Sequence, residues 1–164
     1  MTFFIPVFEQ LNKANVRYIT VGGVATILHG YVRATTDIDL IVDLQVEEAE
    51  KVIKTLSAAG YKPRVPVDAL EFADADKRND WVDSKGMTVF SMFHAEQPGL
   101  SIDLFAKHPI PFNDLWKRSQ IFEVDGTNIR VCSIDDLLSL KEIAGRARDR
   151  DDIEKLLLIK DHDK

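Results

Sequence analysis

The segment RATTDIDLIVD, residues 33–43, places carboxylates inside an otherwise apolar β-strand pattern. Aspartate is among the residues least common in strands, and unpaired charges are rarely buried. Successive side chains of a strand point to opposite faces, so Asp37 and Asp39 share one face, about 6.5–7 Å apart along it. Ile38 and Leu40 point the other way. The segment therefore predicts a strand with one apolar face on a core and one acidic face.

A second segment, LSIDLF at residues 100–105, repeats this arrangement and carries Asp103 on its polar face. If the two strands are neighbours, about 4.8 Å apart, Asp103 joins Asp37 and Asp39. Three carboxylates so close repel one another unless a cation lies among them. Mg²⁺ suits such a site because it takes one or two carboxylates and completes its octahedron with waters and substrate phosphates. Two such ions commonly serve displacement at phosphorus.

A glycine pair lies upstream of the acids, where a strand expected at residues 17–21 meets a helix expected at residues 24–30. Bare backbone N–H groups of Gly22 and Gly23, together with a helix N-terminus, form an anion site. Each feature has an ordinary alternative, since an Asp-x-Asp pair also caps strand ends and a glycine pair also forms a tight turn. The combination of a phosphate cradle and a carboxylate site is more specific than either part.

Composition narrows the class of protein. The chain has 164 residues, 45% of them hydrophobic and 29% charged, which predicts one globular domain with or without a small helical appendage. No run approaches 18 apolar residues, so we expect neither a signal peptide nor a membrane span. The single cysteine, Cys132, excludes an internal disulfide and fits the cytoplasm. The net charge of −6 argues against attraction to nucleic acid over the whole surface.

The rest of the pattern alternates between helices and strands, which predicts an α/β (α+β) fold: a small mixed sheet with flanking helices and C-terminal helices. We expect further elements as follows: helices at 4–14, 46–60 and 112–119, strands at 87–93 and 100–105, a hairpin turning at Asp125-Gly126, and two helical pieces after Ile134 split near 146–148. Residues 1–133 would form the core, and residues 134–164 a helical extension packed on it.

Residues 61–86 are polar and fit this core least well, with one helix expected from residue 67 to about residue 76. We expect this segment to border the acceptor side of a cleft with four of its residues, Arg64, Asp76, Arg78 and Trp81. Trp81 and Trp116 are interpreted as packing residues and not as platforms for stacking a base.

The segment VGGVATILHGYVRATTDIDLIV resembles the signature of the polymerase-β-like nucleotidyltransferase superfamily. That signature has a glycine pair, then Asp-x-Asp ten to thirteen residues later, and a third acid on a later strand. The spacing in RATTDIDL is closest to the minimal bacterial branch, which includes lincosamide and aminoglycoside nucleotidyltransferases and AbiEii-type toxins. The C-terminal segment also resembles this branch, so the resemblance covers about residues 17–157.

The resemblance implies transfer of a nucleoside monophosphate from an NTP to a hydroxyl of a small molecule or protein, with release of pyrophosphate. Asp37 and Asp39 would hold the Mg²⁺ that binds the triphosphate, and Asp103 would complete a second ion site. Asp103 would also take the proton of the attacking hydroxyl. Gly22 and Gly23 would let the backbone approach the β- and γ-phosphates, because no Cβ intervenes.

Two cations are further candidates for binding the nucleotide. Arg33 is an even number of residues from Asp37 and Asp39, so its side chain is expected on the same face of the strand as these acids. It would contact either a phosphate or one of the two aspartates, and both alternatives stay equally open. For Lys141, the resemblance favours a triphosphate contact over a solvated helix face, one turn or so from Arg146 on the same helix. Asp149 and Asp152 are expected to pair with Arg146 or Arg148 and to fix the last two helices.

Two other functions stay open at this point: a toxin-type nucleotidyltransferase that acts on tRNA, and an inactive member that serves as a binding or antitoxin module. The intact acids argue against the second. Residues 141–155 hold five basic and five acidic side chains, which gives no electrostatic footprint for RNA. We therefore expect a cytoplasmic enzyme that uses Mg²⁺ and an NTP, has no membrane partner, and acts on an acceptor that the sequence does not identify. A toxin–antitoxin partner protein is an open alternative.

Overall fold

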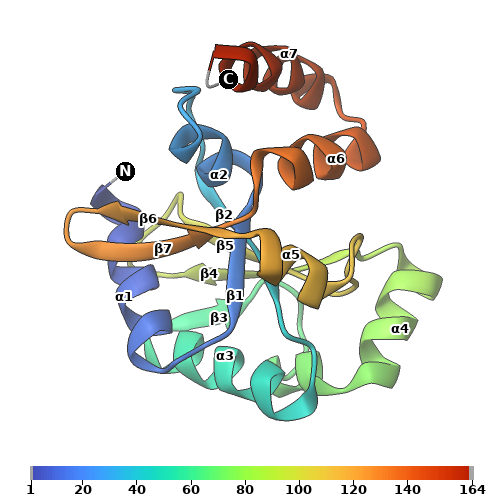
Figure 1. The fold of residues 1–164 in the computed structure, drawn as a ribbon. Coiled ribbons are helices and arrows are strands. Elements are labelled where there is room, and N and C mark those ends of the chain that lie inside the picture. Colours follow the sequence, from blue (N-terminus) through green and yellow to red (C-terminus); the bar gives the residue numbers. More distant parts are fainter. Residues whose placement is uncertain (1, 163–164) are drawn as a thin grey trace.

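A mixed seven-stranded sheet runs through the computed structural model, which describes residues 2–162 (Figure 1). Its strand order is β3-β4-β5-β2-β1-β7-β6. The strands are β1 (Tyr18–Val21), β2 (Asp37–Val42), β3 (Tyr61–Pro63), β4 (Val89–His94), β5 (Ser101–Phe105), β6 (Gln120–Val124) and β7 (Thr127–Val131). β2 pairs with β5 and β1 with β7 in parallel, and the other neighbours are antiparallel. The predicted mixed sheet is confirmed.

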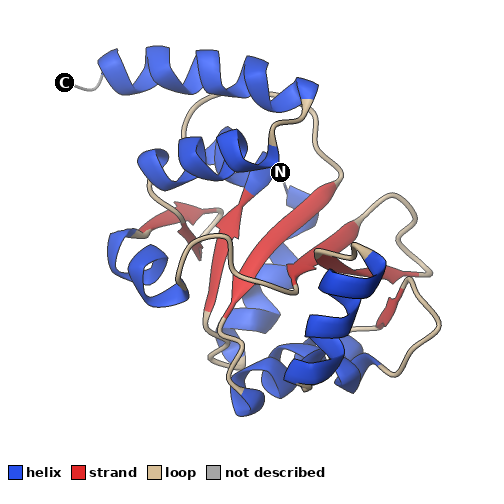
Figure 2. Cartoon of the chain, turned by 90° about the vertical axis from the view of Figure 1, so that its right-hand side faces the viewer, coloured by secondary structure: helices blue, strands red, loops and turns tan. Residues whose placement is uncertain are grey.

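Helices lie around this sheet: α1 (Ile5–Lys13), α2 (Gly22–Leu28), α3 (Val46–Ala58), α4 (Ala75–Lys85), α5 (Phe112–Arg118), α6 (Ile134–Ala144), α7 (Ala147–His162), and the 3-10 turns η1 (Thr2–Phe4) and η2 (Ala69–Ala73). Figure 1 shows α3 and α4 at one end of the molecule, with α6 and α7 beside α2 at the other. Figure 2 shows α6 and α7 crossing that second end of the sheet.

The alternation in β2 divides the sheet into two faces as the sequence predicts. Ile38 and Leu40 are fully buried, whereas Asp37 and Asp39 are half-buried on the other face. The apolar face packs on α1 and α3, which contact each other and contribute buried side chains at helical spacing. Burial of the apolar face fixes the register of β2, because a shift of one residue would bury the acids.

The segment of residues 61–86 differs from the expectation. β3 is not predicted, since three residues that include a proline show no usable alternation. The helix expected at 67–76 is wrong in its position: η2 ends at Ala73, and α4 begins after Asp74. The side chain of Asp74 accepts hydrogen bonds from the backbone N–H groups of Asp76 and Lys77, which starts α4 later in the chain.

Arg78 and Trp81 belong to the core and do not border a cleft, which corrects the expectation for these two residues. Trp81 is buried and stacks on Phe90 at 5.2 Å between ring centroids. The guanidinium of Arg78 donates hydrogen bonds to the carbonyl oxygens of Phe72 at 2.5 Å and Leu44 at 3.3 Å. These contacts hold η2 and α4 against the sheet. The interpretation of Trp81 as a packing residue is confirmed.

The C-terminal helices are separated at Gly145, where the backbone is left-handed (φ +61°) and α6 ends. Lys141 therefore lies on α6 and Arg146 in the link to α7, so the expectation of one shared helix is wrong. A bidentate ion pair between Arg118 and Asp136 ties α6 to the end of α5. The division of the chain at residue 133 stays a prediction. Within residues 2–162, every helix is too short or too polar to span a bilayer.

Replacing Arg78 with alanine should lower the free energy of unfolding by about 2–3 kcal/mol, because buried carbonyl oxygens lose their donor. Urea unfolding followed by circular dichroism measures this change. Lys77→Ala is the matched control, since Lys77 makes only an exposed contact of 3.6 Å with Glu71 and should cost less than about 1 kcal/mol. Equal losses in the two variants would contradict the structural role of Arg78.

Candidate active site

The three predicted acids lie together on one face of neighbouring strands. In the parallel ladder between β2 and β5, Asp39 lies opposite Asp103, and Asp37 lies opposite Ser101. On the other side of β2, Asp39 pairs with Val21 of β1, the residue before the glycine turn. The sheet therefore brings together acids that are 64 positions apart in the chain, as the sequence analysis expected.

Each carboxylate accepts hydrogen bonds from its own surroundings. The Oδ1 atom of Asp37 accepts from the hydroxyls of Ser101 at 2.7 Å and Thr36 at 3.2 Å. A backbone N–H of Gly23 supports the ionised form of Asp39, and a hydroxyl hydrogen bond from Ser91 does the same for Asp103. The acids are thus positioned by polar neighbours while they crowd one another.

Crowding and burial shift the titration of two of these acids. Burial, and then the charges of Asp103 and Asp37, raise the pKa of Asp39 to about 6. Burial also raises the pKa of Asp103, against the opposing effects of Ser91 and of the nearby charges of Arg64 and Arg146. Carboxyl groups with raised pKa values in a cleft are typical of metal-binding or catalytic sites.

The glycine turn lies directly against the acids. Gly22 has a φ of +62°, and a Cβ placed on it would lie 2.0 Å from Oδ2 of Asp39. A Cβ on Gly23 would lie 2.5 Å from the Oγ1 atom of Thr35 and 2.7 Å from a guanidinium nitrogen of Arg33. Both positions therefore exclude a side chain, because Asp39, Thr35 and Arg33 pack directly against the glycine backbone at the start of α2.

Arg33 and Lys141 meet at one buried carboxylate. Oδ2 of Asp152, 1% exposed, accepts from the ammonium of Lys141 at 2.6 Å and from the guanidinium of Arg33 at 2.8 Å. Asp149, also buried, pairs with Arg146 at 2.9 Å and lies 3.8 Å from the Lys141 ammonium. The expected pairing with Arg146 is confirmed for Asp149, whereas for Asp152 it is wrong, because its partners are Lys141 and Arg33. Arg33 pairs with Asp152, so the expected alternative of an ion pair with Asp37 or Asp39 is wrong in its partner.

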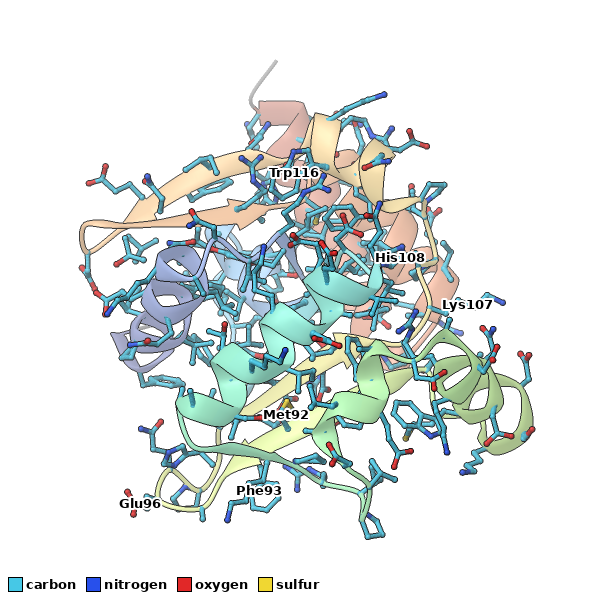
Figure 3. The ribbon with its side chains drawn as sticks, turned by 90° about the horizontal axis from the view of Figure 1, so that it is seen from below. Met92, Phe93, Glu96, Lys107, His108 and Trp116 are labelled. Carbon is cyan, nitrogen blue, oxygen red and sulfur yellow. The ribbon has the colours of Figure 1, made fainter. Side chains whose placement is uncertain are left out.

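Two cavities meet at Asp39 and Arg146. The first, of about 400 Å³, is polar and is lined by Gly23, Arg33, Thr35, Asp37, Asp39, Asp103, Lys141, Arg146, Arg148 and Asp149. The second, of about 450 Å³, is mainly apolar and extends under α6 past Phe105 to Lys107 and His108. Figure 3 shows Lys107 and His108 side by side on the segment after β5. Of the three predicted acids, Asp39 thus lies at the junction of a cation-rich cavity and an apolar one, whereas Asp37 and Asp103 line the polar cavity alone.

The donors fit Mg²⁺ in kind, because hard carboxylate oxygens with raised pKa values gain from a divalent cation. Within residues 2–162, however, no three acidic, histidine or cysteine side chains are already grouped as a metal site. Asp37 instead accepts hydrogen bonds from Ser101 and Thr36. Metal binding by Asp37, Asp39 and Asp103 stays a prediction.

Several residues of the site have no signal in the sequence that separates them from ordinary polar residues. Thr35 and Thr36 precede the first acid, and Ser91 and Ser101 lie on strands that join the site only through the sheet. Arg148 lines the polar cavity from the start of α7. Alternation on β4 and β5 could have identified the serines, because they share a face with Asp103 once the pairing is known.

The comparisons with known proteins agree with this geometry. A family model described as aminoglycoside-2''-adenylyltransferase matches residues 4–156, which include all the site residues named above. No match is found among curated proteins.

Solved structures with similar folds include antibiotic adenylyltransferases. The lincosamide antibiotic adenylyltransferase LnuA, solved with lincomycin, is 20% identical with a TM-score of 0.62, covering 96% of this chain and 95% of that chain. ANT(2'')-Ia, solved with adenylyl-2''-tobramycin, is 13% identical with a TM-score of 0.58 and coverage of 98% and 94%. An antigenic nucleotidyltransferase-like protein from Paracoccidioides brasiliensis is 16% identical, with a TM-score of 0.59 and coverage of 96% and 73%. Because these structures are at most 20% identical to this chain, their similarity to it shows the fold alone.

Gly22→Ala and Gly86→Ala form a matched pair, because their φ angles are +62° and +63° and nothing lies within 4 Å of a Cβ on Gly86. Both variants should lose about 1 kcal/mol of stability through backbone strain, and Gly22→Ala should lose more because its Cβ would clash with Asp39. We expect only Gly22→Ala to displace Asp39 and to lose the thermal stabilisation given by Mg²⁺ and ATP. Differential scanning fluorimetry measures both effects. Retention of the full shift by Gly22→Ala would contradict a functional close approach.

The raised pKa of Asp39 predicts a pH-dependent difference between the wild type and Asp39→Asn without divalent ions. Between the usual value of 3.8 and about 6, the unfolded chain releases the Asp39 proton while the folded protein retains it. Stability of the wild type relative to Asp39→Asn should therefore fall as the pH rises from about 4 to about 6, then level off. Urea unfolding in EDTA at several pH values measures the difference, and a constant difference would contradict the raised pKa.

Proposed function

Since this chain belongs to the aminoglycoside-2''-adenylyltransferase family within the polymerase-β-like nucleotidyltransferases, we propose that it transfers AMP from ATP to a hydroxyl of a small molecule. The chain is a nucleotidyltransferase by its family. The donor, the acceptor class and the dependence on Mg²⁺ are parts of the proposal. The observation that supports it is the row of Asp103, Asp39 and Val21–Gly22, in which two acids lie beside the glycine pair at the start of α2.

Small-molecule acceptors are favoured by the relatives. LnuA was solved with lincomycin and ANT(2'')-Ia with adenylyl-2''-tobramycin, so both structures hold small hydroxyl compounds. The two cavities of this chain, about 400 and 450 Å³, have the size of nucleotide and small-molecule sites. Neither tRNA nor a toxin–antitoxin partner has support from the comparisons.

The triphosphate is proposed to lie in the polar cavity, with its β- and γ-phosphates at the N–H groups of Gly22 and Gly23. Arg33 lies over this turn, and Arg148 lines the same cavity, so both supply positive charge there. Lys141 is 4% exposed and already bound to Asp152. It therefore either acts on the triphosphate indirectly, by holding Asp152 in place, or must leave Asp152 to bind a phosphate. The α-phosphate then falls between Asp39 and Asp103.

The reaction is an in-line displacement at the α-phosphorus. The acceptor oxygen forms a bond to phosphorus, the bond from phosphorus to the bridging oxygen of the β-phosphate breaks, and pyrophosphate leaves. Asp103 takes the proton of the hydroxyl, and its raised pKa brings it closer to neutral pH as a base. Asp37, Asp39 and Asp103 would hold Mg²⁺, which when bound neutralises the charge of the triphosphate and the developing charge at phosphorus.

Labelled nucleotides test this proposal. With Mg²⁺ and a pool of hydroxyl metabolites and antibiotics, label from [α-³²P]ATP should appear on a small molecule, whereas label from [γ-³²P]ATP should appear in pyrophosphate. Asp103→Asn should lower the transfer rate by about 10²-fold or more, because the general base is lost. Asp83→Asn, an exposed aspartate of α4, is the control and should keep the rate.

The same assay contains the outcomes that would contradict the proposal. Label on tRNA or on protein, present in parallel reactions, would overturn the small-molecule acceptor. Wild-type transfer rates in Asp103→Asn would remove this residue from the proton transfer. Transfer that persists at full rate in EDTA would remove the divalent ion from the mechanism.

A further inference from the structure

We propose that the acceptor is a hydroxyl compound with a carboxylate or phosphate group, and that Arg64 binds this anionic group beside Phe93. This inference rests on the proposed function and deepens it, because it names the chemical class of the acceptor. It also departs from what the family description suggests, since aminoglycosides are polycations.

The residues of the site form one row across the sheet. From β1 to β3 the row holds Gly22 after Val21, then Asp39, Asp103, Ser91 and Arg64, through the register of the pairs Val21–Asp39, Asp39–Asp103 and Asp103–Ser91. The backbone N–H of Arg64 donates to the carbonyl oxygen of Ser91 at 2.9 Å, which extends the β3–β4 ladder by one residue. Arg64 therefore lies at the end of the row opposite the glycine turn.

The geometry of the displacement assigns a direction to this row. Attacking and leaving oxygens lie on opposite sides of the phosphorus in an in-line transfer. The proposed pyrophosphate site is at Gly22 and Gly23 on the β1 side, so the hydroxyl approaches from the β5 side, where Asp103 can take its proton. The rest of the acceptor then extends over β4 and β3, toward Arg64.

A small cavity lies at this end of the row. It measures about 290 Å³ and is lined by Arg64, Phe93, His94 and residues of the β4–β5 turn. The guanidinium carbon of Arg64 lies 5.6 Å from the centroid of the Phe93 ring. Figure 3 shows Phe93 on the opposite side of β4 from Met92, which is buried in the core. An aromatic face and a guanidinium offer stacking and a forked donor to a planar anionic group.

Arg64 carries a positive charge that acts on Asp103 at a distance but is not held in an ion pair within the described chain. Arg64 is exposed and has no salt bridge among residues 2–162. Lys62 lies opposite Phe93 in the ladder, so its exposed side chain leaves the sheet on the same face and adds a second cation. Glu96 is in the adjacent turn, and Figure 3 shows it at the edge of the molecule.

The acids that line the cavities are not available to pair with the ammonium groups of a polycation. The three cavities together are lined by four acids: the three proposed metal ligands and Asp149. Asp149 is already paired with Arg146 and lies near Lys141. An acceptor with several ammonium groups would therefore lack partners and face Arg64 and Lys62, whereas an anionic acceptor gains from both.

The spacing of the sheet sets the length of the acceptor. Two strand separations lie between Asp103 and Arg64, which is on the order of 10 Å between their Cα atoms. A hydroxyl and an anionic group at opposite ends of one aromatic ring match this span when the arginine side chain reaches inward. 4-(Hydroxymethyl)benzoate and 4-(hydroxymethyl)phenyl phosphate are the anionic probes, and they distinguish carboxylate from phosphate. The amide and the benzylamine of the same skeleton are the neutral and cationic probes, with tobramycin as the polycation.

Calorimetric binding of each probe to the full chain, with and without Mg²⁺ and α,β-methylene-ATP, tests the proposal. We expect at least one anionic probe to bind about tenfold or more tightly than its amide, and the benzylamine and tobramycin to bind most weakly. Arg64→Ala should remove this preference, and Arg64→Lys should restore part of it. Arg150→Ala, an exposed arginine on α7 outside the three cavities, is the matched control and should keep the preference.

Every outcome decides the proposal. No binding of either anionic probe, equal binding of the charge series, tighter binding of tobramycin, or an unchanged preference in Arg64→Ala would overturn it. Binding of the ATP analogue without any preference among the probes would overturn this inference alone. Absence of nucleotide binding would overturn the proposed function, while the preference for anions at Arg64 would still be measured in the samples without nucleotide.

Discussion

The shape of the site depends on the ion pairs of one buried carboxylate, that of Asp152. It binds the ammonium of Lys141 on α6 and the guanidinium of Arg33 in the segment before β2, and it lies on α7. Removal of one partner from such a buried group leaves a charge without compensation, which commonly costs 3–5 kcal/mol. The pair of C-terminal helices is therefore held against the glycine turn by electrostatics as well as by apolar contact, and the polar cavity exists because these three elements meet.

This arrangement also explains why the acids can crowd. Asp39 and Asp103 feel the charge of Arg146, which is fixed by Asp149 in the link between α6 and α7. Hydrogen bonds from Ser91, Ser101 and the backbone of Gly23 also stabilise the ionised carboxylates. A site of this kind stores repulsion that a divalent ion with a triphosphate relieves. The strand ladder, which is rigid and buried on its other face, holds the acids in place against that repulsion.

Membership of the aminoglycoside-2''-adenylyltransferase family indicates the reaction, nucleotidyl transfer, more firmly than it indicates the acceptor. The proposed nucleotide side of the site consists of backbone N–H groups and sheet carboxylates. The proposed acceptor side is formed by the outward-facing residues of β3 and β4 and by the β4–β5 turn, whose side chains can change without loss of the buried residues on the other face. In this chain that side carries Arg64 and Lys62, so its charge differs from what a polycationic antibiotic requires.

The sequence by itself determined the parts of this protein that follow from local periodicity. Alternation placed Asp37 and Asp39 on one face of β2 and Asp103 on the matching face of β5, and the glycine pair marked the junction of β1 with α2, where it forms the start of the helix. The same local patterns could not place η2 and α4, because the Asp74 cap outweighed a weak helical pattern. Only the tertiary structure decided that Lys141 and Arg33, 108 positions apart, share Asp152, and that Arg64 ends the row of acids. Contacts of this kind depend on strand order and helix packing, which bring distant residues together without a signal in either segment.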